Sequence, residues 1–137
     1  LLNNGSRPSA LIIADLDGLK VVNDIYGHRD GDDYIRKSCQ ILKKVTRSSD
    51  NIFRIGGDEF LILVNNTNKA GIDRIIKEIK AECDTQKAEY NFNISLGVSL
   101  VIEEEANFDK HFEIADYNMY QNKVANKALI ANKTIEN

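Results

Sequence analysis

Two short apolar runs, separated by four residues that do not suit a hydrophobic core, constrain this chain more than any other feature. The runs cover residues 52–55 and 60–64, and Gly56-Gly57-Asp58-Glu59 leads from the first into the second. Two glycines between β-rich runs predict a tight hairpin, because glycine adopts positive φ without steric cost. Adjacent carboxylates beside bare glycine backbone suit a divalent cation and a closely approaching ligand. The alternative is a polar turn that is merely solvated.

A second acidic pair favours the binding interpretation. Residues 10–14 form a continuous apolar run, typical of a strand buried on both faces, and Asp15 and Asp17 lie at its end. Ligands collect at strand ends where helices flank an open sheet, so we expect chemistry at this point. Asp17 also suits the N-cap of the helix that follows, and the sequence leaves both roles open.

Hydrophobic periodicity along the whole chain predicts the element order β-α-α-β-β-α-β-α. Helices are expected over residues 19–26, from Gly31-Asp32 to residue 45, over 72–83 and over about 108–131. A last strand is expected over residues 91–102, and Gly97 within it suits a β-bulge. The central hairpin pairs antiparallel, so helices packed on a mostly antiparallel sheet predict an α+β fold. At 137 residues the chain fits a single domain, residues 1–137.

Composition excludes several classes of protein. The net charge of −3 gives no general attraction to nucleic acid or to an anionic membrane, and no apolar run exceeds five residues. Cys39 and Cys83 form no CxxC pair and fall on helix stripes, which favours buried free thiols in a reducing cytoplasm. We therefore expect a cytoplasmic domain without nucleic-acid or membrane contact, which a larger parent protein can still anchor to a membrane.

Several spaced motifs together resemble the GGDEF family, the diguanylate cyclases. They are Asp15-Leu16-Asp17-Gly18-Leu19-Lys20, Asn23-Asp24-Ile25-Tyr26-Gly27-His28, Gly31-Asp32 and Arg54-Ile55-Gly56-Gly57-Asp58-Glu59-Phe60. A chance occurrence of Gly-Gly-Asp-Glu would not be accompanied by the other three motifs in the same order. The resemblance implies a palm-like fold with a ferredoxin-like core, a sheet flanked by helices, and the condensation of two GTP molecules into cyclic di-GMP with release of pyrophosphate.

The same resemblance implies a metal site. Asp15 and Asp58 would bind Mg²⁺ or Mn²⁺ together with the carbonyl of Leu16, and Glu59 would support the site. Asp58 or Glu59 would assist deprotonation of the attacking 3′-hydroxyl, and the sequence does not divide these two roles.

Substrate positions follow from the family in the same way. Asn23 and Asp32 would bind guanine, Gly56 and Gly57 would admit the α-phosphate, and Lys20, Lys123 and Lys127 would contact phosphates. From the residues alone, Asp32 also suits a helix N-cap or first turn, and the lysine pair at i and i+4 also suits a solvated basic face.

Arg47-Ser48-Ser49-Asp50 resembles the family's RxxD inhibitory site, at which the product cyclic di-GMP binds. The alternative for Arg47 and Asp50 is a salt bridge that caps the preceding helix.

Catalysis would need a homodimer, because each domain would hold one GTP. The family's usual leading helix and its Asp-x-Leu-Thr-Gly-Leu segment are not seen, which suggests a piece of a larger signalling protein. The rival function is a non-catalytic regulatory module that binds cyclic di-GMP or GTP, and a third is a polymerase-like or mononucleotide cyclase palm.

Overall fold

The computed structural model describes residues 8–86, 91–102 and 107–136, with side chains described as far as residue 129. Its elements are β1 (Pro8–Leu16), α1 (Leu19–Tyr26), α2 (His28–Val45), β2 (Asn51–Arg54), β3 (Glu59–Asn65), α3 (Lys69–Gln86), β4 (Ile94–Leu100) and α4 (Phe108–Glu136). This is the predicted order of strands and helices.

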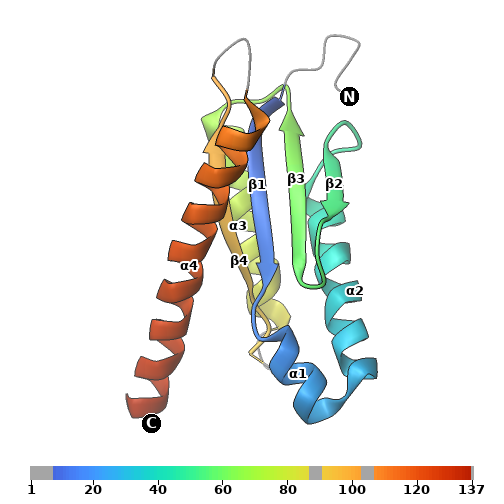
Figure 1. The fold of residues 1–137 in the computed structure, drawn as a ribbon, viewed down its shortest axis with the longest axis vertical. Coiled ribbons are helices and arrows are strands. Elements are labelled where there is room, and N and C mark those ends of the chain that lie inside the picture. The colour runs from blue at the N-terminus through green and yellow to red at the C-terminus, as the bar shows by residue number, and fades with distance from the viewer. Residues whose placement is uncertain (1–7, 87–90, 103–106, 137) are drawn as a thin grey trace.

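A four-stranded sheet with the order β2-β3-β1-β4 forms the centre of the molecule (Figure 1). Each strand pairs antiparallel with its neighbours, so β1 lies between β3 and β4. Every residue of β1 from Ala10 to Leu16 is buried, as the continuous apolar run predicts. The predicted α+β fold is therefore confirmed.

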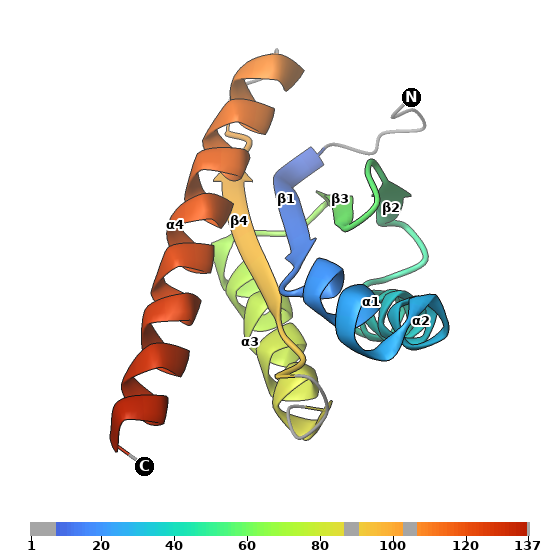
Figure 2. The same cartoon turned by 60° about the horizontal axis from the view of Figure 1, so that its bottom comes forward.

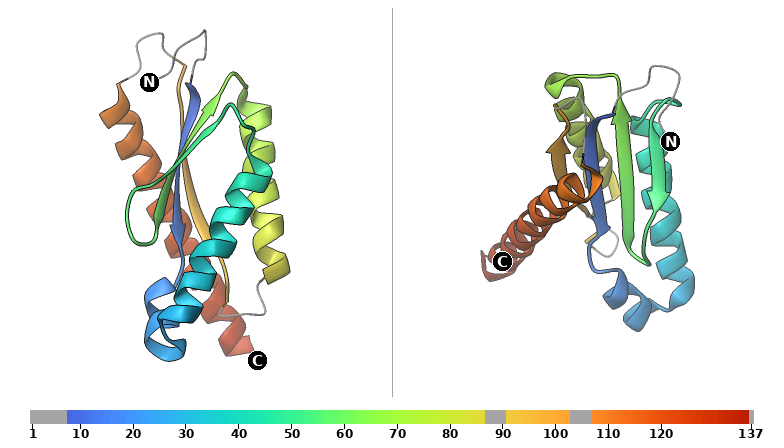
Figure 3. Two further views of the ribbon diagram at one scale, coloured as in Figure 1. Left: turned by 90° about the vertical axis from the view of Figure 1, so that its right-hand side faces the viewer. Right: turned by 45° about the horizontal axis from the view of Figure 1, so that its top comes forward.

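Helices cover both faces of this sheet. Figures 2 and 3 show α4 on one face, with α2 and α3 on the other. Alternate residues of β1 point to opposite faces: Leu11 and Ile13 pack with Ala115 and Met119 of α4, whereas Ile12 belongs to the larger core beneath the other helices. None of the described helices combines the length and apolar character needed to cross a bilayer.

Both cysteines are free thiols, as the sequence predicts. Cys83 of α3 is buried in the larger core, and Cys39 of α2 is partly buried and packs against it. Burial raises the pKa of the Cys83 thiol to about 11. Both residues therefore act as small apolar groups in the core.

The start of α2 differs from the sequence prediction. The helix begins at His28 instead of at Gly31-Asp32, because Gly27 takes a positive φ of 96° and reverses the chain directly after α1. Asp30 is the acidic residue of the first turn. The N-cap or first-turn role considered for Asp32 is therefore wrong.

The Gly-Gly loop reverses direction without the positive φ angles that the sequence suggested. The described glycines with positive φ are Gly18 and Gly27, and neither Gly56 nor Gly57 is among them. The loop has four residues between β2 and β3 and is closed by a bond from the Ile55 N–H to the Glu59 carbonyl at 3.0 Å. Loops of this length are built around ordinary turns, so the mirror-image geometry of a two-residue hairpin is not needed.

Gly97 marks a close approach of a helix and not the predicted bulge. Pairing of β4 with β1 runs through Gly97 without a register shift. A Cβ at this position would clash with the carbonyl of Ala115 and would lie 2.6 Å from the Cα of Met119. Glycine is required here because the backbone of α4 lies directly against β4.

Replacement of Gly97 by alanine should therefore destabilise the fold, because two backbones must separate to admit the methyl group. We expect Gly97→Ala to lower the free energy of unfolding by about 1–3 kcal/mol in urea denaturation. Gly57→Ala is the matched control, since a Cβ there meets nothing within 4 Å. Equal losses in the two variants would contradict this view of the α4–β4 contact.

Candidate functional site

The acidic residues of the two motifs meet at one end of the sheet. Asp15 of β1 and Glu59 of β3 are direct partners in the antiparallel register, so their Cβ atoms lie roughly 4.5–5.5 Å apart. The Leu16 N–H donates to the Asp58 carbonyl at 2.8 Å. The pairing of β1 with β3 thus brings together all four residues predicted to hold a metal.

Burial and mutual repulsion act on these acids. Asp15 is only 6% exposed, and burial raises the pKa of its carboxyl, with further increases from Asp58 and Asp17. Burial likewise raises the pKa of Glu59, and Asp15 adds to the effect. A cation placed among these carboxylates would favour their charged forms and so oppose both the burial and the repulsion that raise their pKa values.

Lys123 of α4 supplies one such cation. Its Nζ lies 2.9 Å from Oδ1 of Asp15, and both side chains are largely buried. Burial alone would lower the pKa of Lys123, but the hydrogen bond and the charge of Asp15 raise it overall. The Lys123 ammonium therefore lies against the acidic cluster, in direct contact with Asp15.

The donor chemistry suits a divalent cation, although the side chains do not yet form a coordination shell. Within the described part of the chain, no three His, Cys, Asp or Glu side chains are arranged to hold a metal ion. Three carboxylates and a backbone carbonyl form an all-oxygen donor set, which is the set that Mg²⁺ prefers. Ligation of a cation by these residues therefore requires their carboxylates to come closer together than the structure has them.

Five of the predicted site residues line one shallow groove between α1, the start of α2 and the Gly-Gly loop. The lining residues of this hairpin groove are Leu19, Lys20, Asn23, Asp24, His28, Asp32, Ile35, Arg54, Gly57 and Asp58. Residues predicted for guanine and residues predicted for phosphate and metal thus share one surface. Gly56 precedes Gly57 in the same loop, and a Cβ built on Gly56 would lie 3.8 Å from the Glu59 side chain.

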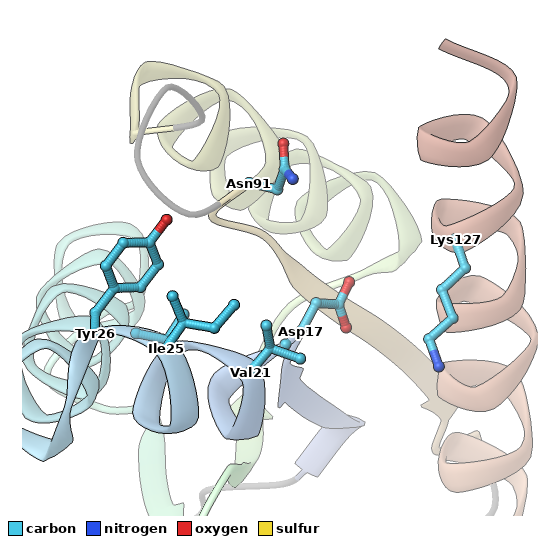
Figure 4. A pocket seen from close by; sticks show the side chains of 8 residues that line it. Asp17, Val21, Ile25, Tyr26, Asn91 and Lys127 are labelled. Carbon is cyan, nitrogen blue, oxygen red and sulfur yellow. The ribbon is translucent and has the colours of Figure 1, made fainter. Parts of the chain in front are cut away.

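Lys127 faces a different hollow. It lines a mainly apolar pocket between α1 and α4, together with Asp17, Gly18, Val21, Val22, Ile25, Tyr26 and Asn91. Figure 4 shows Lys127 on α4 across this pocket from Asp17, with Val21 and Ile25 along the opposite wall. Lys123 therefore lies against Asp15, and Lys127, one helical turn further along α4, lines this pocket together with Asp17.

Asp17 does not cap α1. The N-cap is Gly18, at φ 73° and without a side-chain capping bond, so the cap interpretation is wrong. Instead the Asp17 carboxylate accepts hydrogen bonds from Ser95 Oγ at 2.7 Å, Asn93 Nδ2 at 2.9 Å and Asn126 Nδ2 at 3.5 Å. Its partners lie on distant parts of the chain, which is why local sequence patterns did not reveal them.

Two residues with clear roles in shaping the groove were not assigned from the sequence. Arg54 donates from Nε to the Gly56 carbonyl at 3.2 Å and from Nη2 to the Gly57 carbonyl at 2.8 Å, so it holds the loop in shape. Gly31 makes room for Asn23, since a Cβ on Gly31 would lie 2.7 Å from Asn23 Cγ. Both residues stand inside the quoted motifs, but only coordinates reveal these contacts.

The Arg47–Asp50 pair anchors the segment between α2 and β3. The Asp50 side chain is fully buried and accepts from Arg47 Nη2 at 3.2 Å, from the Arg47 N–H at 2.9 Å and from the Asn65 N–H at 3.0 Å. Arg47 also donates to the Asn65 carbonyl, while its side chain stays 45% exposed. The salt bridge considered for this pair is therefore present, but the C-cap of α2 is Thr46 and not Arg47.

Comparisons with known proteins agree with this arrangement. The family described as diguanylate cyclase, GGDEF domain, matches residues 1–128. Diguanylate cyclase DgcS of Shewanella oneidensis is 33% identical over 120 residues, which cover 86% of this chain and 40% of DgcS. The chain therefore spans less than half the length of that relative.

Solved structures give the same result for the fold. The GGDEF domain of TpbB (YfiN) from Pseudomonas aeruginosa superimposes with a TM-score of 0.76 at 27% identity, covering 85% of this chain and 71% of that one. A microbial GGDEF domain described in its interaction with cyclic di-GMP gives a TM-score of 0.71 at 28% identity, covering 86% and 74%. The palm-like architecture of GGDEF domains is thereby confirmed for this chain.

The contact between Gly31 and Asn23 predicts an energetic coupling. In a helix interior, Gly→Ala normally stabilises by about 0.5–1 kcal/mol. We expect Gly31→Ala to destabilise instead, because the new methyl group displaces the Asn23 side chain. In an Asn23→Ala background the clash is gone, so the same change should raise the free energy of unfolding measured in urea. A Gly31→Ala effect that does not depend on residue 23 would refute the contact.

Proposed function

Because this chain belongs to the GGDEF family, we propose that it is a diguanylate cyclase, which condenses two GTP molecules into cyclic di-GMP and releases two pyrophosphates. The observation that carries the proposal is the convergence of Asp15, Asp58 and Glu59 beside a groove lined by Asn23 and Asp32. Such a reaction needs carboxylates that bind a divalent cation close to polar groups that bind the guanine base.

Guanine is assigned to the hairpin groove. The Asp32 carboxylate would accept hydrogen bonds from N1–H and the exocyclic amine of guanine, and Asn23 would complete the contact from α1. Adenine lacks both donors on the matching edge. A site built around such bonds rejects an analogue without them by roughly 10⁴–10⁵-fold.

The triphosphate is assigned to the space between the Gly-Gly loop and α4. Gly56 and Gly57 would let the α-phosphate approach the backbone, and Lys20, Lys123 and Lys127 would contact phosphate oxygens. Asp15, Asp58, Glu59 and the Leu16 carbonyl would hold Mg²⁺ or Mn²⁺. When bound, the cation neutralises the phosphates and stabilises the charge that develops at the α-phosphorus.

Two domains would face each other, so that each GTP presents its 3′-hydroxyl to the α-phosphate held by the partner. Asp58 or Glu59 would take the proton from that hydroxyl. The chain's own contribution is mainly positioning, since its side chains orient base, phosphates and hydroxyl without a covalent intermediate.

Incubation with GTP and Mg²⁺, followed by chromatographic separation of the nucleotides, tests the function directly. We expect cyclic di-GMP from the wild type and a loss of at least 100-fold in rate for Asp58→Ala, because one metal-binding carboxylate is gone. Asp73→Ala is the control, since Asp73 lies exposed on α3 and pairs only with Lys69 in the contacts described. Bound but unchanged GTP would favour the regulatory module, and 3′,5′-cyclic GMP would favour a mononucleotide cyclase.

The need for two domains predicts a specific dependence on concentration. Because one domain holds only half of the reacting groups, the rate per protomer should rise with protein concentration until the dimer saturates. Initial rates measured over a hundredfold dilution series will reveal this dependence. A rate per protomer that does not change on dilution would contradict the two-domain mechanism.

Product inhibition is proposed for the Arg47–Asp50 segment. Since Asp50 is fully buried and already accepts internal hydrogen bonds, Arg47, whose side chain is half-exposed, is the residue that would meet cyclic di-GMP. In this assignment Asp50 holds Arg47 in place.

We therefore expect Arg47→Ala to relieve inhibition by added cyclic di-GMP by at least tenfold in its half-maximal concentration. Arg47→Lys should relieve it as well, because lysine keeps the charge but loses the two-pronged geometry. Arg74→Ala is the matched control, an exposed arginine paired with Glu78 on α3. If all three variants are inhibited like the wild type, Arg47 serves only the internal ion pair.

A further inference from the structure

Three asparagines form a row along α4. Asn118, Asn122 and Asn126 are spaced by four residues, so they lie on one face of the helix. Each of them bonds to the strand beneath. The bonds run from Asn118 Nδ2 to the Val98 carbonyl at 2.9 Å, from the Leu96 N–H to Asn122 Oδ1 at 2.8 Å, and from Asn126 Nδ2 to Ser95 Oγ at 3.1 Å.

The first two asparagines satisfy the free edge of the sheet. β4 lies at the edge of the sheet, and its backbone groups that point away from β1 have no partner among the described strands. Asn118 and Asn122 bond to two of these groups. Their role is therefore structural, because they dock the helix on the sheet.

Asn126 makes a different contact. Its amide reaches two side chains, Ser95 Oγ at 3.1 Å and the Asp17 carboxylate at 3.5 Å, and Ser95 itself donates to Asp17 at 2.7 Å. Asp17 stands two residues after Asp15, at the start of the loop into α1. The third asparagine thus ties α4 to the acidic end of β1.

In the part of α4 that carries this tie, the described side chains supply no buried apolar anchor. Met119 is buried, but none of the side chains described after it, as far as residue 129, is buried. Figures 1 and 3 show this half of α4 running beyond the sheet. Polar contacts therefore fix its position, and Asn126 makes the outermost of those described, beyond Asn122 and Lys123.

Two site lysines flank this tie. Lys123 lies one turn before Asn126 and contacts Asp15, and Lys127 follows Asn126 directly. We propose that Asn126, acting through Ser95 and Asp17, is a positioning residue that holds Lys123 and Lys127 at the distance a bound triphosphate requires. The proposal rests on the function proposed above and adds a residue to that site.

The test compares Asn126→Ala with Asn118→Ala. Both changes remove one asparagine bond between α4 and β4, but only the first lies beside the lysines. We expect Asn126→Ala to raise the KM for GTP by about tenfold while kcat changes by less than about threefold, as expected when a binding contact is lost. Asn118→Ala should change the KM by less than about twofold, whatever it does to the Tm.

A partner substitution separates positioning from a general loss of structure. Ser95→Ala removes the hydroxyl that links Asn126 to Asp17, so it should raise the KM in the same direction. The double variant should be no worse than the more impaired single variant, because both act through one network. Additive effects, or an Asn126→Ala KM equal to that of the wild type, would overturn the proposal.

Hydrogen–deuterium exchange gives a readout that does not depend on turnover. Backbone amides of residues 123–129 should exchange at least about fivefold faster in Asn126→Ala than in the wild type, and at the wild-type rate in Asn118→Ala. Unchanged exchange in Asn126→Ala would overturn the positioning role. A wild type that neither binds nor converts GTP would overturn the proposed function, and the exchange rates would still decide whether Asn126 fixes this end of α4.

Discussion

The antiparallel register between β1 and β3 is the constraint on which the rest of the structure depends. It places Asp15 opposite Glu59 and joins Leu16 to Asp58. A shift of one residue would move every side chain of β1 to the other face, so the two hydrophobic cores resist it. Packing energy far from the acids thus keeps them buried and close together, and burial, with a smaller contribution from neighbouring carboxylates, raises the pKa values of Asp15 and Glu59.

The long helix α4 completes the arrangement from the other face of the sheet. Its first half is held by apolar packing and by the close approach at Gly97. Its second half leaves the core and depends on polar contacts, which bring Lys123 to within 2.9 Å of Asp15. Apolar packing therefore holds the first half of α4 and polar contacts hold the second half. The change from one to the other occurs where the helix passes Asp15.

Much of this could be predicted from the sequence, because the relevant signals are local. The order of elements and the buried central strand follow from the hydrophobic pattern alone. What could not be predicted depends on contacts between distant residues. Gly97 resembles a bulge until α4 is placed against it, and Asp17 resembles an N-cap until Ser95 and Asn126 are seen to surround it. The candidate site residues follow from the motifs, whereas the supporting roles of Arg54 and Gly31 required coordinates.

The central claim is that the acids of β1 and of the Gly-Gly loop share one divalent cation in the presence of GTP. Paramagnetic broadening of backbone amide signals by Mn²⁺, with a non-hydrolysable GTP analogue bound, measures this most directly. The account predicts that the amides of residues 15–16 and 58–59 broaden first and together. Broadening centred elsewhere, or confined to only one of the two segments, would contradict it.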